Sequence, residues 1–258
     1  MTRRRRFLGT AAAALAGVGG CLGGPGEGDD PAENTPESVD LSLSTVQRGV
    51  VKFTYPDAIS VVETDRRFVA VTAAVATDDP PSHREFALRF DGEEYGVRVP
   101  DRRGQHYRLG PLYTDWSPGG QLLFALPPTG NADDAAVVTP EGEWPLPAAA
   151  RNRMETAPSF AVTVESVGSE GAPGFAIEAT NEGDRPQRFL AAVNQTGPMY
   201  APVDAPTTVI DGGATATLKA TVSTGPAAVL TTASDGEERT GRVSFDWVGG
   251  SAERSVPL

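Results

Sequence analysis

The residue types that most often carry chemistry are sparse in this chain of 258 residues. It has two histidines, His83 in a proline-rich loop and His106 beside a tyrosine, and neither belongs to a His-Glu-x-x-His metal motif. No Gly-x-Ser-x-Gly elbow marks a serine nucleophile. The sequence therefore predicts no catalytic residue, no metal site and no bound cofactor, so we expect the protein not to be an enzyme.

Carboxylates are abundant, but their order does not match a dedicated cation-binding loop. Asp78-Asp79 and Asp133-Asp134 fall in predicted loops, where neighbouring carboxylates could bind calcium. A dedicated calcium loop spaces its acids as Asp-x-Asp-x-Asp, and these segments do not. Solvated acidic loops are the simpler interpretation.

The densest group of aromatic residues is Tyr107, Tyr113 and Trp116, close to His106 and Asp115. The last two aromatics flank a stretch rich in turn-forming residues, which favours partial exposure. Exposed aromatic rings can stack on sugars or anchor a protein partner, whereas packing in the core is the alternative. These three residues are the candidate binding patch.

The elements that would position these residues are strands. Short apolar runs with period two recur at intervals of 8 to 12 residues and are separated by Gly, Pro and Asp turns. Asp91-Gly92 between two such runs is a strong hairpin signal, and no window favours a long amphipathic helix. We therefore predict an all-β fold. The predicted strands are 41–46, 68–76, 86–90, 95–99, 107–109, 122–126, 135–138, 144–146, 160–164, 175–179, 188–193, 207–210, 216–222, 228–230 and 243–248.

The strands divide into two groups. Prolines, an alanine cluster and two arginines between Pro145 and Pro158 interrupt the pattern, and one short helical turn is expected there. We predict a first β-sandwich domain over 41–150 and a second over 156–258. Ahead of them, residues 21–40 hold almost no large apolar side chains and are expected to form a disordered tether.

The amino-terminal segment indicates export and anchoring. Arg4-Arg5-Arg6-Phe7-Leu8 precedes an uncharged run that is too short to span a bilayer. Its paired arginines, with Phe7 and Leu8, resemble the twin-arginine export motif. Val18-Gly19-Gly20-Cys21 then resembles a lipobox, which implies that residues 1–20 are removed and that Cys21 carries a lipid anchor in the membrane. A plain secretory signal with an incidental cysteine is the alternative.

Export also gives meaning to Asn194-Gln195-Thr196, which matches the acceptor sequence for N-glycosylation at Asn194.

Charge indicates the surroundings of the protein. Without residues 1–20 the chain loses four arginines and no acid, leaving 18 basic and 34 acidic residues and a formal net charge of −16. Lys52 and Lys219 are its two lysines. Such an acidic, lysine-poor surface is typical of halophilic proteins, because molar salt shortens the Debye length to about 3 Å and screens the repulsion. The same charge argues against nucleic acid as a partner.

Taken together, the export motif, the lipobox and the acidic composition resemble a haloarchaeal surface lipoprotein. Gly119-Gly120 followed by Leu122-Leu123-Phe124 is similar to the telokin-like domains of secreted lipoproteins. Thr180-Asn181-Glu182-Gly183-Asp184 with a later Gly-Gly turn resembles adhesion-related sandwich domains. These resemblances imply two tandem immunoglobulin-like β-sandwiches displayed outside the cell, without a known reaction.

Two functions of different class fit these features. The leading hypothesis is a lipid-anchored, non-catalytic surface protein that binds a protein or glycan partner or builds the envelope. The second is a solute-binding or enzyme-accessory lipoprotein in which Tyr107, Tyr113 and Trp116 line a ligand cleft. A hydrolase is a distant third, because the catalytic motifs are missing.

The lipid anchor gives the first testable prediction. Replacing Cys21 by serine removes the thiol that would carry the lipid, so Cys21→Ser should leave the membrane fraction and appear as a soluble protein of lower lipid mass. Membrane fractionation and intact-mass spectrometry measure both effects. A Cys21→Ser protein that stays membrane-bound with unchanged mass would contradict the lipobox interpretation.

Overall fold

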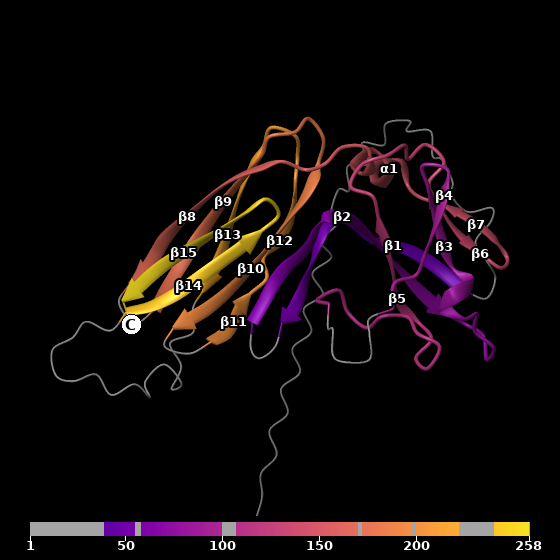
Figure 1. The fold of residues 1–258 in the computed structure, drawn as a ribbon, viewed down its shortest axis with the longest axis horizontal. Helices are drawn as coiled ribbons and strands as arrows, with labels where there is room; N and C mark the ends of the chain where they lie inside the picture. The colour runs from indigo at the N-terminus through magenta and orange to yellow at the C-terminus, as the bar shows by residue number, and fades with distance from the viewer. Residues whose placement is uncertain are drawn as a thin grey trace, which may run out of the picture. The chain divides into compact units, whose positions relative to one another are not determined.

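Figure 1 shows a computed structural model of the chain. The structure describes residues 39–54, 58–99, 107–169, 172–197, 200–221 and 240–257. Several predictions fall outside these ranges: the export residues Arg4, Arg5, Phe7 and Leu8, the lipidation site Cys21, the tether up to residue 38, His106, and the strand at 228–230.

Antiparallel strands make up most of the described chain, which confirms the all-β class. A short helix, α1 (Ala148–Met154), lies where the sequence predicted a helical turn, and a 3-10 turn covers His83–Glu85. Within the described ranges, no helix has the length and hydropathy needed to cross a membrane. The strands are β1 (Val39–Thr54), β2 (Ala58–Val75), β3 (Ala87–Phe90), β4 (Glu93–Gly96), β5 (Gly120–Leu126), β6 (Ala136–Thr139), β7 (Gly142–Pro145), β8 (Phe160–Ser169), β9 (Ala172–Asn181), β10 (Gln187–Gly197), β11 (Tyr200–Asp204), β12 (Thr207–Ile210), β13 (Thr215–Thr221), β14 (Thr240–Trp247) and β15 (Gly250–Pro257).

The strands before α1 form two antiparallel sheets with one core between them. One sheet has the order β1-β2-β5, and the other has the order β4-β3-β6-β7. Val69, Val71 and Phe124 from the first sheet pack against Leu88 and Val137 from the second. Since alternate side chains of a strand point to opposite faces, each strand gives every second residue to this core.

The strands after α1 repeat this arrangement. One sheet has the order β13-β9-β8, and the other has the order β11-β10-β14-β15, with β12 also paired to β10. Phe175 and Ile177 of β9 pack against Phe189 of β10 and Phe245 of β14. The rings of Phe175 and Phe245 meet edge to face, with centroids 4.8 Å apart. Both groups of strands are therefore sandwich-like, and the division into two domains stays a prediction.

The β1–β2 hairpin has a sharp irregularity in its middle. Its proximal part pairs Val39–Arg48 with Arg67–Val75, and its distal part pairs Val50–Thr54 with Ala58–Val62. Between them, Gly49 alone lies opposite residues 63–66. Gly49 has a φ of 71°, and an added Cβ there would approach the carbonyl oxygen of Val62 to 3.0 Å. Such a bulge requires glycine at this position and bends the hairpin.

The distal part of the hairpin packs on the outer face of the sheet that contains β10 and β14 (Figure 1). Leu190 and Ala192 lie on this face, because they alternate with the core residues Phe189, Ala191 and Val193. A buried apolar cluster seals the contact. It consists of Val51, Ile59, Val61, Leu190, Ala192 and Val248.

Two polar side chains hold the free edge of β2 in this contact. The side chain of Asn194 accepts a hydrogen bond from the Ile59 amide at 2.7 Å and donates one to the Ile59 carbonyl, also at 2.7 Å. Asp246 accepts a hydrogen bond from the Val61 amide at 2.9 Å. The Asn194 amide thus replaces the neighbouring strand that Ile59 lacks on this side.

The structure differs from the sequence prediction in several elements. β1 and β2 are far longer than predicted, and β11 and β15 were not predicted. Residues 107–109 form a bridge at Tyr107 followed by a turn rather than a strand, and β4 begins two residues earlier than predicted. The Asp91-Gly92 hairpin is confirmed, with Phe90 paired to Glu93 and positive φ at both turn residues.

The Asn194 contact generates a stability prediction. Asn194→Ala leaves the Ile59 amide and carbonyl buried without partners, and each such group costs about 1–3 kcal/mol. The free energy of unfolding should therefore fall by roughly 2–5 kcal/mol, measured by urea denaturation. The exposed Asn152, changed to alanine, is the matched control and should leave stability nearly unchanged. Equal stability of the two variants would contradict the role given to Asn194.

Candidate functional site

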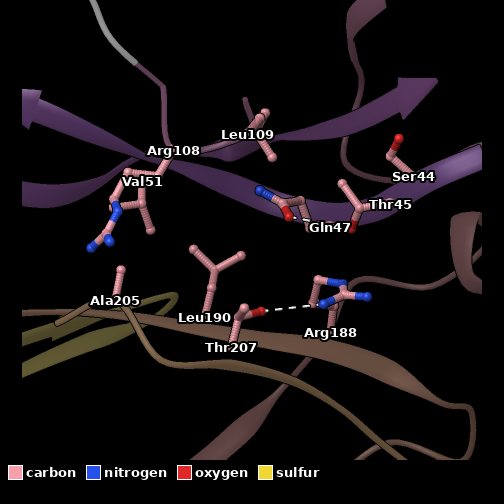
Figure 2. A pocket seen from close by; sticks show the side chains of 10 residues that line it. All are labelled: Ser44, Thr45, Gln47, Val51, Arg108, Leu109, Arg188, Leu190, Ala205 and Thr207. Atoms are coloured by element: carbon pink, nitrogen blue, oxygen red, sulfur yellow. Dashed lines mark hydrogen bonds between the residues drawn. The ribbon is translucent and has the colours of Figure 1, made fainter. Parts of the chain in front are cut away.

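A cleft opens where β1 and residues 108–109 face β10 and β12 (Figure 2). We call it the junction cleft. Its volume is about 380 Å³, within the range of roughly 300–1,000 Å³ that is usual for small-molecule sites. It is lined by Ser44, Thr45, Gln47, Val51, Arg108, Leu109, Arg188, Leu190, Ala205 and Thr207.

Irregularities in β1 position one wall of the junction cleft. The register of β1 against β2 shifts at Ser44 and again at Gly49, which re-aims the side chains between these residues. The Thr45 hydroxyl donates to the Gln47 side-chain oxygen at 3.3 Å, and the Gln47 amide donates to the Gly49 carbonyl at 3.0 Å. Both side chains belong to buried residues, so these bonds fix the polar wall before any ligand arrives.

Arg188, on β10, provides a half-buried cation at one end of the cleft. Its Nη1 donates to the Thr207 hydroxyl at 3.4 Å. Its Nε is buried and has no hydrogen-bond partner in the described part of the chain. Burial, and to a smaller extent the charge of Arg153, lowers the pKa of Arg188. The guanidinium is therefore half-buried, and no carboxylate among the described residues forms an ion pair with it.

Arg108 provides a second cation. Its backbone amide donates to the Val51 carbonyl at 3.0 Å, which ties the segment to the distal part of β1. The residue is exposed. In Figure 2 the guanidinium groups of Arg108 and Arg188 lie on either side of Leu190.

The chemistry of the described lining favours an anionic ligand. It contains two arginines and no aspartate or glutamate, although the chain has 34 acidic residues. The hydroxyls of Ser44, Thr45 and Thr207 add hydrogen-bonding groups, and Leu190 supplies apolar surface. Arginine binds carboxylates through charge-assisted hydrogen bonds. Nothing in this lining resembles a nucleophile with an adjacent base.

The aromatic residues predicted as a binding patch do not come together on the surface. Tyr107 is 6% exposed and packs in a cluster with Phe68 and other buried residues. Tyr113 is fully buried, with its hydroxyl donating to the Pro81 carbonyl at 2.7 Å. Trp116 alone of the three is exposed, at 63%. Two of the rings are core residues because their strand-like positions face inward, and none of the three lines the junction cleft.

His83 helps to hold two loops together through Asp115 and is not part of a catalytic relay. One oxygen of Asp115 lies 2.6 Å from His83 Nδ1, accepts from the Ser82 hydroxyl at 2.8 Å and accepts from the His83 amide at 3.0 Å. Bonding to the His83 side chain first, and then to Ser82, lowers the pKa of Asp115. The serine hydroxyl bonds to the carboxylate and not to the imidazole, so the order of a Ser-His-Asp relay is not formed.

The structure also bears on metal binding and on the predicted glycosylation site. Among the described residues, no three His, Cys, Asp or Glu side chains converge as a metal site requires. Asn194 is 6% exposed, and both polar atoms of its amide bond to Ile59. The folded chain therefore does not present this nitrogen to a glycosylating enzyme. The sequence motif at 194–196 predicted an acceptor. A local motif carries no information about a partner as distant in the chain as Ile59.

The arginines of the junction cleft were not found from the sequence. Arg188 was visible as a charge at the head of the apolar run 189–193, a position where a solvated side chain is the usual interpretation. Only the packing of β10 against β1 places it in the same cleft as Arg108.

Comparison of the chain with models of known protein families and with curated proteins finds no match. The fold and the cleft define an all-β protein with sandwich-like pairs of sheets and a cleft lined by two arginines at their junction.

Asp246 generates a prediction of pH dependence. Burial raises its pKa above the ordinary value of 3.8, and the hydrogen bond from Val61 only partly opposes this. The folded chain therefore binds more protons than the unfolded chain as the pH falls through the raised pKa towards 3.8, and it gains stability there. Asp246→Asn keeps an acceptor for Val61 and removes the desolvated charge.

The variant should consequently be more stable than the original at pH 7, and this advantage should shrink towards pH 4. Urea unfolding at both pH values measures it. The exposed Asp211, changed to asparagine, is the control. A difference between Asp246→Asn and the original that does not vary with pH would refute the assignment.

Proposed function

We propose that this protein is a lipid-anchored, extracellular binding protein without catalytic activity, built from two tandem immunoglobulin-like domains and exported by the twin-arginine route. The twin-arginine and lipobox resemblances support the location on the outer face of the cytoplasmic membrane. The two sandwich-like pairs of sheets support the architecture. An acidic composition supports a halophilic, archaeal origin.

The observation that carries the binding function is the junction cleft. In a chain with many more acids than bases, a cleft whose described walls hold two arginines and no carboxylate departs from the composition. The half-buried Arg188 guanidinium, which has no described carboxylate partner, would form charge-assisted hydrogen bonds with an anion. The missing partner concerns Arg188 alone, so the many acidic residues elsewhere in the chain do not supply it.

The mixture of groups in the cleft narrows the ligand to a hydroxylated anion, such as an acidic saccharide. Its carboxylates would bind Arg108 and Arg188 on the two sides of Leu190, and its hydroxyls would bind Thr45 and Thr207. The alternative function, a solute-binding lipoprotein, is close to this proposal. It was expected to have a cleft lined by aromatic residues, whereas the junction cleft is lined by two arginines. A purely architectural envelope role is the other alternative, and it requires no ligand in the cleft.

Binding of trigalacturonate, measured by isothermal titration calorimetry, tests the proposal. The original protein should bind it, and neutral galactotriose should bind at least tenfold more weakly. Arg188→Gln and Arg108→Gln should each reduce affinity about tenfold to a hundredfold, since a hydrogen bond to a charged group is worth about 1.5–3 kcal/mol.

Arg84→Gln is the matched control, because Arg84 is exposed on the 3-10 turn away from the cleft lining. It should bind like the original. Absence of binding, equal binding of the neutral trisaccharide, or full affinity in Arg188→Gln would overturn the assignment of the cleft and favour the architectural role.

A further inference from the structure

The outward-facing side chains of β10 and β12 continue the junction cleft past its lining. Ile210 packs in the core, so Val209 and Thr207, one and three residues before it, point to the outer face. The register places Val209 opposite Arg188. In the next row of the same face, Thr207 lies opposite Leu190. Val209 is therefore the direct neighbour of an arginine that lines the cleft.

The Arg188 side chain leaves Val209 uncovered. Its Nη1 donates to the Thr207 hydroxyl at 3.4 Å (Figure 2). Thr207 belongs to the next row, so the guanidinium reaches along the strand pair and not across it to Val209. The valine remains 40% exposed, and its apolar surface is open to a ligand that binds Arg188.

Exposure alone does not mark Val209 as functional. Single exposed apolar residues are common on proteins, and β-branched residues are favoured in strands. Within the described ranges, the other exposed large apolar side chains are Phe53, Trp116 and Val167. Val209 differs from them in its cross-strand partner, which is an arginine of the junction cleft.

Polar and apolar side chains alternate over these two rows. Arg188 and Thr207 form one diagonal, which is polar and joined by a hydrogen bond. Leu190 and Val209 form the other diagonal and flank the polar one on both sides. A hydroxyl placed against valine loses hydrogen bonds to water, whereas a methyl group placed there is favourably removed from water. A ligand whose anionic group binds Arg188 is therefore favoured if it carries an apolar substituent close by.

We propose that the junction cleft prefers an acidic saccharide that bears a small acyl substituent, such as an O-acetyl group, on the same ring as its carboxylate. The inference rests on the function proposed above, because it concerns the same ligand and the same arginine. The carboxylate binds Arg188, and the methyl of the acetyl group packs on Val209. Val209 is then a residue that determines specificity, while the arginines recognise the charge.

The expected gain in affinity is modest because one methyl group is involved. Removing a group of the size of CH₂ from water raises affinity about fourfold. Acetylation of a hydroxyl leaves the charge of the ligand unchanged, so the electrostatic attraction to the two arginines is the same for both forms. A preference for the acetylated form therefore reports the apolar contact and not the basic character of the cleft.

Isothermal titration calorimetry with trigalacturonate and O-acetylated trigalacturonate tests this preference. The original protein should bind the acetylated trisaccharide about threefold to tenfold more tightly. Val209→Thr keeps the branched shape and the strand propensity of the side chain and replaces one methyl group by a hydroxyl. The variant should lose the preference and bind the unmodified trisaccharide within about twofold of the original affinity.

Val167→Thr is the matched control, because Val167 is 41% exposed on β8 and does not line the cleft. It should keep the preference for the acetylated trisaccharide. Equal binding of the two trisaccharides by the original protein, or a preference that persists in Val209→Thr, would overturn this inference and leave the anion-binding function standing. If neither trisaccharide binds, the proposed function and this inference are both wrong.

Discussion

The hydrogen bonds between Asn194 and Ile59 fix the arrangement on which the rest of the described structure depends. A strand that leaves its own sheet exposes backbone groups along one edge, and a buried edge must be satisfied. The distal part of β2 meets this requirement with two side chains from β10 and β14, Asn194 and Asp246. The apolar cluster around Leu190 and Ala192 then excludes water from the same contact. Without this pairing the hairpin would not pack on β10. Neither the buried cluster nor the cleft beside it would then form.

Local patterns in the sequence were enough to identify the class of fold. Alternation of apolar residues marked most strands, and the Asp91-Gly92 turn marked its hairpin, because both signals act between residues close in the chain. The extension of β1 and β2 was missed since Gly49 and the polar run 63–67 resemble a loop. In the structure they form a bulge inside a continuous hairpin.

The site was beyond such patterns for a different reason. Arg108 and Arg188 are 80 residues apart, and their proximity results from the docking of the hairpin on β10. Tyr107 and Tyr113, by contrast, were predicted to form a binding patch because exposed aromatic rings often bind sugars or protein partners. Their burial follows from the size of their apolar surface, which contributes more to a core than to an exposed patch. Asn194 illustrates the same limit, since its sequon is local and its structural partner lies 135 residues away.

One segment of β1 serves two faces of the fold. Between the bulges of β1, Thr45 and Gln47 line the junction cleft, while Val46 packs in the core on the opposite face. The bonds from Thr45 to Gln47 and from Gln47 to the Gly49 carbonyl hold the bent conformation that both faces require. A ligand that binds the cleft would favour the same conformation. Its binding and the packing of the core behind β1 are therefore linked, and each would stabilise the other.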